Sequence, residues 1–257
     1  MIQYTIIGDE AQAVEIGLDP GQTVIAEAGA MSYMNDAIKF ETRKGDNGPV
    51  SAGDGVVGAL VRAGRNLLGE AALLLTHFTN TGESRRSVAF SAPWPGKIMV
   101  LDLTNYNGEI FCQKESFLCA ADNTRIEIAF SRRFGAGLFG KEGFILERLS
   151  GVGPAFIHVG GALVEKTLKN ETIKVDSGCI AAFTTGLDYS IEQADHLKST
   201  MFGGRALFLA SLSGTGTVFL QTLPFSRLAD RVINGAAAHG KTAKAGVRYE
   251  LFKKQAL

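Results

Sequence analysis

Short apolar runs separated by glycine-containing turns recur along most of the chain. Residues 151–160 and 214–221, for example, interleave glycines with the branched and aromatic residues that favour strands. Glycine has no Cβ, so it reaches the positive φ angles that tight turns require. The pattern therefore predicts many short β-strands joined by tight turns.

Parts of the chain resemble one another at fixed spacings. Residues 138–157 align without a gap with residues 201–220, and Leu149-Ser-Gly151 falls on Leu212-Ser-Gly214. The two segments are 63 residues apart, and we call this spacing the repeat offset. A weaker copy at 67–82 aligns with the first of these segments so that Gly69 falls on Gly140. Three shorter segments upstream, each a polar turn followed by an apolar run, also resemble one another: 21–26, 115–120 and 177–182. Such internal similarity predicts repeated structural units.

We interpret the chain as three related β units at about residues 1–90, 91–159 and 160–222. Each unit is too small to bury an apolar face alone, so we expect one all-β body over residues 1–222. Packing about a pseudo-threefold axis is the most economical arrangement of three such units. Residues 223–257 then form a separate C-terminal helix and basic tail.

Two segments depart from the strand pattern. Residues 224–239 begin with Pro224 and place apolar side chains on one helical face, which predicts an amphipathic helix. That face carries Phe225, Leu228, Val232 and Ile233. Residues 51–68 have a weaker helical spacing interrupted by Gly58 and Gly64, so we expect a short helix or a loop there.

The charge of the chain is balanced, with 26 Lys and Arg residues against 26 Asp and Glu residues. This balance argues against coating nucleic acid or an anionic membrane through bulk electrostatics. The three cysteines, Cys112, Cys119 and Cys179, are odd in number and have apolar neighbours, which favours free thiols in a reducing compartment. The start of the chain lacks a signal-peptide pattern, and no apolar run approaches the roughly 20 residues that span a bilayer. We therefore expect a cytoplasmic protein.

One glycine motif matches the pattern of a nucleotide-binding loop. Residues 135–141 satisfy Gly-x-Gly-x-x-Gly and the first seven positions of a phosphate-binding loop. The phosphate loop needs Ser or Thr next, however, and Glu142 in that position would repel phosphate. The third unit keeps the glycine and hydrophobic pattern without the motif, so we interpret Gly140 as part of a shared turn.

The remaining polar residues predict no catalytic, cofactor or metal site. His77, His158, His196 and His239 lie far apart and lack metal-ligand spacing, although a fold that placed His77 or His158 beside a carboxylate in a pocket would revive an enzymatic reading. Ser150 and Ser213 belong to the repeated Leu-Ser-Gly turn and to no nucleophile elbow.

Basic residues cluster at Arg132 and Arg133 and in the tail, where Lys253 and Lys254 lie near its end. The tail is either a solvated surface or an interaction arm for RNA, anionic lipid or a protein partner.

Several motifs together, in their order and spacing, resemble the altered-inheritance-of-mitochondria protein 24 family. They are Gly69-Glu70, Pro95-Gly-Lys-Ile98, Ser116-Phe-Leu118, Gly143-Phe-Ile-Leu146, Leu149-Ser-Gly-Val-Gly153, Val175-Asp-Ser-Gly178 and Phe219-Leu-Gln-Thr222. The resemblance covers nearly all of residues 1–235. It implies a fold resembling the tryptophan RNA-binding attenuation protein, with β-sandwich units of double-stranded β-helix type, and it implies a scaffold role connected with mitochondrial membrane organisation in fungal members. The fold name does not imply RNA binding here, because the units share no basic motif.

The leading hypothesis is a non-enzymatic β scaffold that forms homo-oligomers or binds a protein or peripheral membrane partner. The alternative is a module that binds a small ligand or RNA through the glycine-rich turns or the basic tail. The candidate interaction surface comprises Phe225, Leu228, Val232, Arg132, Arg133, Lys253 and Lys254.

Overall fold

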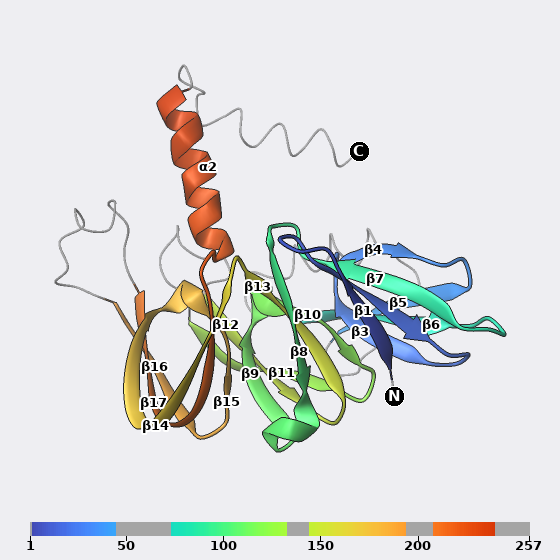
Figure 1. Cartoon of the computed structure of the whole chain (residues 1–257), viewed down its shortest axis with the longest axis horizontal. Helices are drawn as coiled ribbons and strands as arrows, with labels where there is room; N and C mark the ends of the chain where they lie inside the picture. The colour runs from blue at the N-terminus through green and yellow to red at the C-terminus, as the bar shows by residue number, and fades with distance from the viewer. Residues whose placement is uncertain (1, 45–72, 133–143, 194–207, 240–257) are drawn as a thin grey trace. The chain divides into compact units, whose positions relative to one another are not determined.

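The computed structural model describes residues 2–44, 73–132, 144–193 and 208–239. Two segments singled out above, the expected helix or loop at 51–68 and the glycine motif at 135–141, lie outside these ranges. The chain divides into two compact units, Met1–Pro224 and Phe225–Leu257. The described part of the first compact unit consists of three antiparallel sheets, and their strands run from blue to orange in Figure 1.

The first sheet comes entirely from the N-terminal third of the chain. Its strands lie in the order β1 (Gln3–Ile7), β2 (Ala13–Leu18), β7 (Arg86–Ser91) and β4 (Met31–Met34). Strand β2 shows the alternation of a sheet with one buried face. Val14, Ile16 and Leu18 are fully buried, and the residues between them are partly exposed. One face of this sheet therefore packs against the rest of the body.

The other two sheets combine strands from different regions of the sequence. The second has the order β5 (Ile38–Lys44), β6 (Leu74–Asn80), β3 (Thr23–Glu27), β10 (Phe117–Ala121), β13 (Pro154–Gly160) and β8 (Gly96–Asp102). The third has the order β11 (Arg125–Arg132), β12 (Phe144–Ser150), β9 (Glu109–Gln113), β15 (Ile180–Thr184), β17 (Phe208–Gln221) and β14 (Leu163–Asp176), with β16 (Leu187–Gln193) also paired to β17. Three short 3-10 helices accompany them: η1 (Leu103–Tyr106), η2 (Lys114–Ser116) and η3 (Ser177–Cys179).

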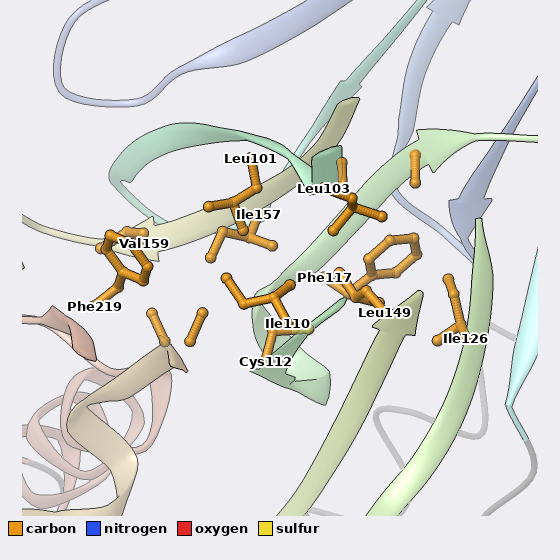
Figure 2. Packing of buried hydrophobic residues seen from close by; sticks show 14 of the residues in the cluster. Leu101, Leu103, Ile110, Cys112, Phe117, Ile126, Leu149, Ile157, Val159 and Phe219 are labelled. Atoms are coloured by element: carbon orange, nitrogen blue, oxygen red, sulfur yellow. The ribbon is translucent and has the colours of Figure 1, made fainter. Parts of the chain in front are cut away.

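Three apolar clusters hold the sheets together. One, including Ile16, Phe90 and Phe156, lies between the first and second sheets. A second, around Leu101, Ile110, Phe117 and Leu149, lies between the second and third sheets and is drawn in Figure 2. The third cluster consists of side chains of the third sheet alone, including Phe144, Leu168 and Phe183, because that sheet curls into a half-barrel.

The strand pairing repeats along the chain. A β-bulge between β10 and β13 leaves Leu118 out of register, and the bulge between β15 and β17 leaves out Ala181, which is the residue that the repeat offset places on Leu118. The pairing of β4 with β7 has the same irregularity at Ser32. The repeat offset found in the sequence is therefore also an offset between equivalent strand registers.

Neighbouring units join through equivalent strands. β3 pairs with β10 between the first and second units, and β9 pairs with β15 between the second and third. In the second position of each junction, Ile25 meets Ala120 and Phe111 meets Phe183. The counterpart of β3 is thus β9, and residues 21–26 do not correspond to residues 115–120 as their sequences suggested.

Two glycines permit a sharp bend at the same place in the second and third units. Gly151 has φ of 145° and Gly214 has φ of 131°. A Cβ on Gly151 would lie 2.7 Å from the carbonyl oxygen of Asn123, and one on Gly214 would lie 2.3 Å from that of Gly186. The repeated Leu-Ser-Gly segment therefore serves a backbone bend at close quarters.

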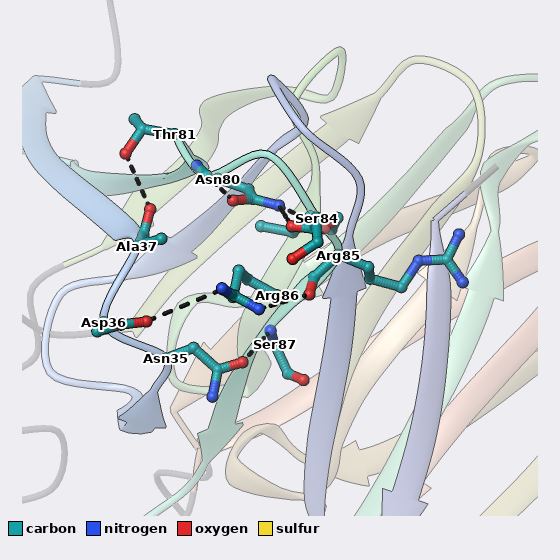
Figure 3. A network of polar contacts seen from close by, with 11 residues as sticks. Asn35, Asp36, Ala37, Asn80, Thr81, Ser84, Arg85, Arg86 and Ser87 are labelled. Atoms are coloured by element: carbon teal, nitrogen blue, oxygen red, sulfur yellow. Dashed lines mark hydrogen bonds and ion pairs between the residues drawn. The ribbon is translucent and has the colours of Figure 1, made fainter.

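Asn80 links three backbone segments in the first unit. Its amide nitrogen donates to the carbonyl oxygens of Leu18 at 2.8 Å and Ser84 at 2.9 Å, and its oxygen accepts from Gly82 N–H at 2.9 Å. Figure 3 shows this network beside Asn35, Arg85 and Arg86. Asn80 is fully buried, so these bonds fix the turn between β6 and β7.

The second compact unit, Phe225–Leu257, contains helix α2 (Phe225–His239). The predictions of a mainly β body and of a C-terminal helix are confirmed.

Candidate functional site

An open groove of ligand size lies next to β1. Its volume is about 640 Å³, within the range that small-molecule sites occupy. It is lined by Ile2, Tyr4, Gln22, Thr23, Val100, Asp102, Thr104, Ala121, Asp122, Asn123, Val152, Gly153 and Pro154. Val152 and Gly153 belong to the glycine-containing turn between β12 and β13, and Pro154 begins β13.

The groove carries negative charge. Asp102 and Asp122 line it, and none of the described lining residues is Lys or Arg. The Asp102 carboxylate accepts a hydrogen bond at 3.0 Å from the backbone N–H of Thr104 and so caps η1. A ligand for this groove would carry a cationic or neutral polar group beside an apolar part, which would meet Val100 and Pro154.

Asp122 also contacts a histidine. Its carboxylate lies 3.2 Å from His77 Nδ1, and the two side chains are 54% and 18% exposed. These residues are distant in the sequence, and strand pairing brings them together. This is the His and carboxylate contact that would allow an enzymatic reading, although His77 is not itself among the groove-lining residues.

Glu147 is a carboxyl group buried inside the fold. It is 1% exposed, and neither carboxyl oxygen has a hydrogen-bond partner among the described residues. Burial raises its pKa to about 8; the nearby charge of Glu27 adds to the rise and that of Lys114 opposes it. The group is therefore largely neutral at pH 7.

The partner of Glu147 across the ladder is Cys112 on β9. Burial raises the pKa of Cys112 well above its ordinary value, with smaller contributions from Glu147 and Glu27. Burial does the same for Cys119. Both thiols stay protonated and packed in the core, and Cys179 is half-buried.

His158 is another buried titratable group. It is 2% exposed and its ring makes an edge contact with Trp94, with ring centroids 4.8 Å apart. Burial lowers its pKa to about 4, against a smaller opposing contribution from the Trp94 backbone. A Cβ on Gly96 would lie 2.4 Å from His158 Nε2, so the imidazole ring packs directly against the Gly96 backbone.

Helix α2 presents apolar side chains to solvent. Phe225 is 42% exposed and Val232 is 64% exposed, whereas Leu228 is half-buried. Their spacing of three and four residues places them on one helical face. Three of the predicted interaction residues are therefore on a formed helix.

The side chains of the basic residues of the predicted surface lie outside the described part of the chain. Arg132 ends β11, and its side chain lies outside the described part of the chain, as do Arg133, Lys253 and Lys254. Within the described ranges no three His, Cys, Asp or Glu side chains gather in a way that would hold a metal ion. None of the described helices is long and apolar enough to cross a membrane.

A protein family described as mitochondrial biogenesis AIM24 matches residues 4–223. The chain belongs to this family. The match covers the described strands from β2 to β17, so the AIM24 region corresponds closely to the first compact unit. No curated protein matches the chain significantly.

A solved structure shows the same fold. The crystal structure of protein SPYM3_0169 from Streptococcus pyogenes is similar to this AIM24 family member with a TM-score of 0.69. The sequences are 21% identical, and the alignment covers 91% of this chain and 99% of that chain. The similarity therefore extends over the whole β body of the AIM24 region.

Sequence reasoning missed the groove, the contact of His77 with Asp122 and the burial of Glu147. The internal alignments contain a signal for the burial of Glu147. In the internal alignments Glu147 falls on Ala210 in the third unit and on Thr76 in the first, and both counterparts are buried.

Proposed function

We propose that the chain is a non-enzymatic, self-associating β scaffold that supports membrane-associated assemblies in the cytoplasm. The observation that carries the proposal is the exposed apolar face of α2, where Phe225 and Val232 are 42% and 64% exposed. Exposed apolar patches on a soluble unit mark association surfaces, because association removes them from water. The occupant we propose for this face is the same face of a second copy.

The description of the family as one of mitochondrial biogenesis supports a role in assembly. The buried titratable groups fit the same role. Glu147 and His158 are at most 2% exposed, so a substrate reaches neither without opening of the core, as general acid or base catalysis would require.

We propose that the three units resemble those of the tryptophan RNA-binding attenuation protein and lie about a pseudo-threefold axis. The recurring bulges at Ser32, Leu118 and Ala181 support equivalent units. The rotation between successive units, measured in an experimental structure, would test the axis.

Size-exclusion chromatography with light scattering tests self-association. The full chain should elute with a molar mass above that of the monomer. The double variant Phe225→Ser, Val232→Ser should elute with a smaller molar mass, because its apolar face is removed. The variant Arg231→Ser changes a polar residue of the same helix and should behave as the wild type. A strictly monomeric full chain that also retains no partner in pull-downs would contradict the proposal.

The groove supports a second candidate function, binding of a small cationic ligand with an apolar part. Its volume of about 640 Å³ and its two carboxylates, Asp102 and Asp122, are the specific observations. A thermal-shift panel of amines and basic peptides should then give stabilisation that is lost in Asp122→Asn. Retained stabilisation in that variant, or none across the panel in the wild type, would argue against this function. The contact of His77 with Asp122 also allows a test for enzymatic activity. The wild type and His77→Gln are compared in a screen for hydrolysis, and an activity that depends on this contact is lost in the variant.

A further inference from the structure

The two junctions inside the chain leave a third pair of equivalent edges, on β4 and β14, and these two described strands do not pair with each other within the chain. We propose that β4 of one copy pairs with the C-terminal half of β14, residues 172–176, of a second copy. This inference rests on the self-association proposed above, and it concerns a surface separate from α2. It would join copies head to tail by the same strand pairing that joins the units within one chain.

The two internal junctions are the same junction repeated. Between the first and second units, Cys119 pairs with Ala26. Between the second and third, Ala182 pairs with Cys112. The repeat offset places Cys119 on Ala182, and both directly follow the residue skipped by the bulge.

One strand of each of the two kinds that form these junctions remains at the end of a sheet. β4 occupies the position of β10 and β15, because its bulge falls at Ser32. Residues 172–176 of β14 occupy the position of β9, because Val175 pairs with Ala210 as Cys112 pairs with Glu147. Among the described residues, β4 and β14 each end their sheet, so no described strand covers either outer edge.

The equivalences also predict the register. Tyr33 follows the bulge in β4 as Ala182 does in β15, and the repeat offset places Cys112 on Val175. Tyr33 should therefore face Val175, Met34 should face Lys174, and Asn35 should face Ile173. The pairs run antiparallel, as they do in both internal junctions.

The backbone of β4 is oriented for this pairing. The N–H of Asn35 donates to the carbonyl oxygen of Ser87 on β7 at 3.0 Å. Backbone groups of successive residues in a strand point to opposite edges, so the N–H and C=O of Met34 point away from β7. Met34 would then exchange hydrogen bonds with Lys174, whereas Tyr33 and Val175 would form the closer, non-hydrogen-bonded pair.

The side chains match in part. Tyr33 is 48% exposed and would extend the apolar cluster of the third sheet, which already contains Val175. Met34 packs at the edge of the cluster between the first and second sheets, where the aliphatic stem of Lys174 would cover it. Both internal junctions are wholly apolar at these two positions, so the junction between copies should be weaker and reversible. A lysine at such an edge also disfavours indiscriminate strand pairing.

The contact uses different surfaces on the two copies. Such heterologous contacts generate a ring when the rotation between copies closes and a filament when it does not. Each copy can therefore engage two neighbours at once.

Disulfide trapping tests the register. Tyr33→Cys with Val175→Cys, in a Cys179→Ser background, places two thiols at a non-hydrogen-bonded pair whose Cα separation of about 4.5 Å suits a disulfide. Oxidation of the full chain should give a ladder of dimers, trimers and larger species on a non-reducing gel, which continues for a filament and ends at the number of copies in the ring for a closed ring. Tyr33→Cys alone should stop at a dimer. Tyr33→Cys with Lys169→Cys moves one thiol along β14 by about 20 Å and should give no series beyond the dimer.

Each other outcome overturns the inference. An oligomeric chain whose cysteine pair gives no cross-linked ladder would refute the strand junction while leaving self-association through α2 standing. A disulfide formed within one copy would show that the two edges meet inside the chain. A monomeric chain with no cross-link would remove both this inference and the proposed function. If the introduced cysteines cross-link instead to a different protein in the native host, β4 or β14 pairs with a strand of that protein and not with a second copy.

Discussion

Glu147 and Cys112 face each other across β12 and β9, and the carboxyl of Glu147 lies beside apolar neighbours with 1% of its surface exposed. The pKa of Glu147 is about 8 in the folded chain, against an ordinary value of 4.5. The unfolded chain therefore loses this proton at lower pH than the folded chain does. The free energy of unfolding should fall as the pH rises from about 4.5 to about 8, and this term should level off above that.

Glu147→Gln should remove this slope and make the protein more stable than the wild type at pH 8. One pKa unit corresponds to about 1.4 kcal/mol, so the effect is on the order of 4 kcal/mol. Urea unfolding between pH 5 and pH 8 measures it, and the exposed Glu165→Gln serves as the control. An unchanged slope in Glu147→Gln would show that another group causes it.

His158 should give the opposite pH dependence. Its pKa is about 4 when folded and 6.5 ordinarily, so the unfolded chain binds the proton first as the pH falls. Stability is fully present above pH 6.5 and should decline by on the order of 3 kcal/mol towards pH 4. His158→Phe keeps a ring against Trp94 and should flatten this decline in thermal unfolding, whereas His77→Gln should not.

Alanine at the two bend glycines should destabilise the body by similar amounts. Positive φ costs a residue with a Cβ about 1 kcal/mol or more, and the carbonyl oxygens of Asn123 and Gly186 leave no room for the added carbon. Gly151→Ala and Gly214→Ala should each cost at least about 2 kcal/mol in denaturant unfolding. Gly21→Ala is the matched control, because Gly21 has φ of 81° and nothing within 4 Å of the added carbon. Equal losses at all three positions would mean that φ alone matters.

Asn80→Ala should lower the free energy of unfolding by about 3 kcal/mol, because three hydrogen bonds made by the buried Asn80 side chain are lost. Asn35→Ala removes the acceptor of one bond, from the Ser87 N–H at 2.7 Å, at an exposed site where water can replace it. Its loss should stay below about 1 kcal/mol. Chemical denaturation of the two variants side by side decides between them, and a small loss in Asn80→Ala would show that the turn relaxes.

Much of the architecture was accessible from the sequence, because its signals are local. Glycine-bounded apolar runs predicted the strands, the spacing of Phe225, Leu228 and Val232 predicted α2, and the repeat offset is also an offset between strand registers. The junctions were less accessible. Residues 21–26 look like residues 115–120 because both are a turn followed by a buried strand, but pairing depends on which edge each strand presents.

The site residues were harder still to predict. His77 and Asp122 meet because β6 and β3 are paired and β3 is in turn paired with β10, which no local pattern encodes. Glu147 looked like an ordinary surface charge beside Arg148, and only its small, buried counterparts Thr76 and Ala210 indicated otherwise. The groove arises where turns from separate units meet, so it has no sequence pattern of its own.

The pairing of β3 with β10 and of β9 with β15 bears on the order in which the protein is made. A chain leaving the ribosome presents β3 before β10 exists, and β9 before β15 exists, so each unit waits with an uncovered edge until the next is synthesised. Truncation after the second unit would leave β9 without β15 and expose the edge that the last unit normally covers. Nascent chains stopped at residue 160 should therefore be caught by chaperones or aggregate more readily than complete ones.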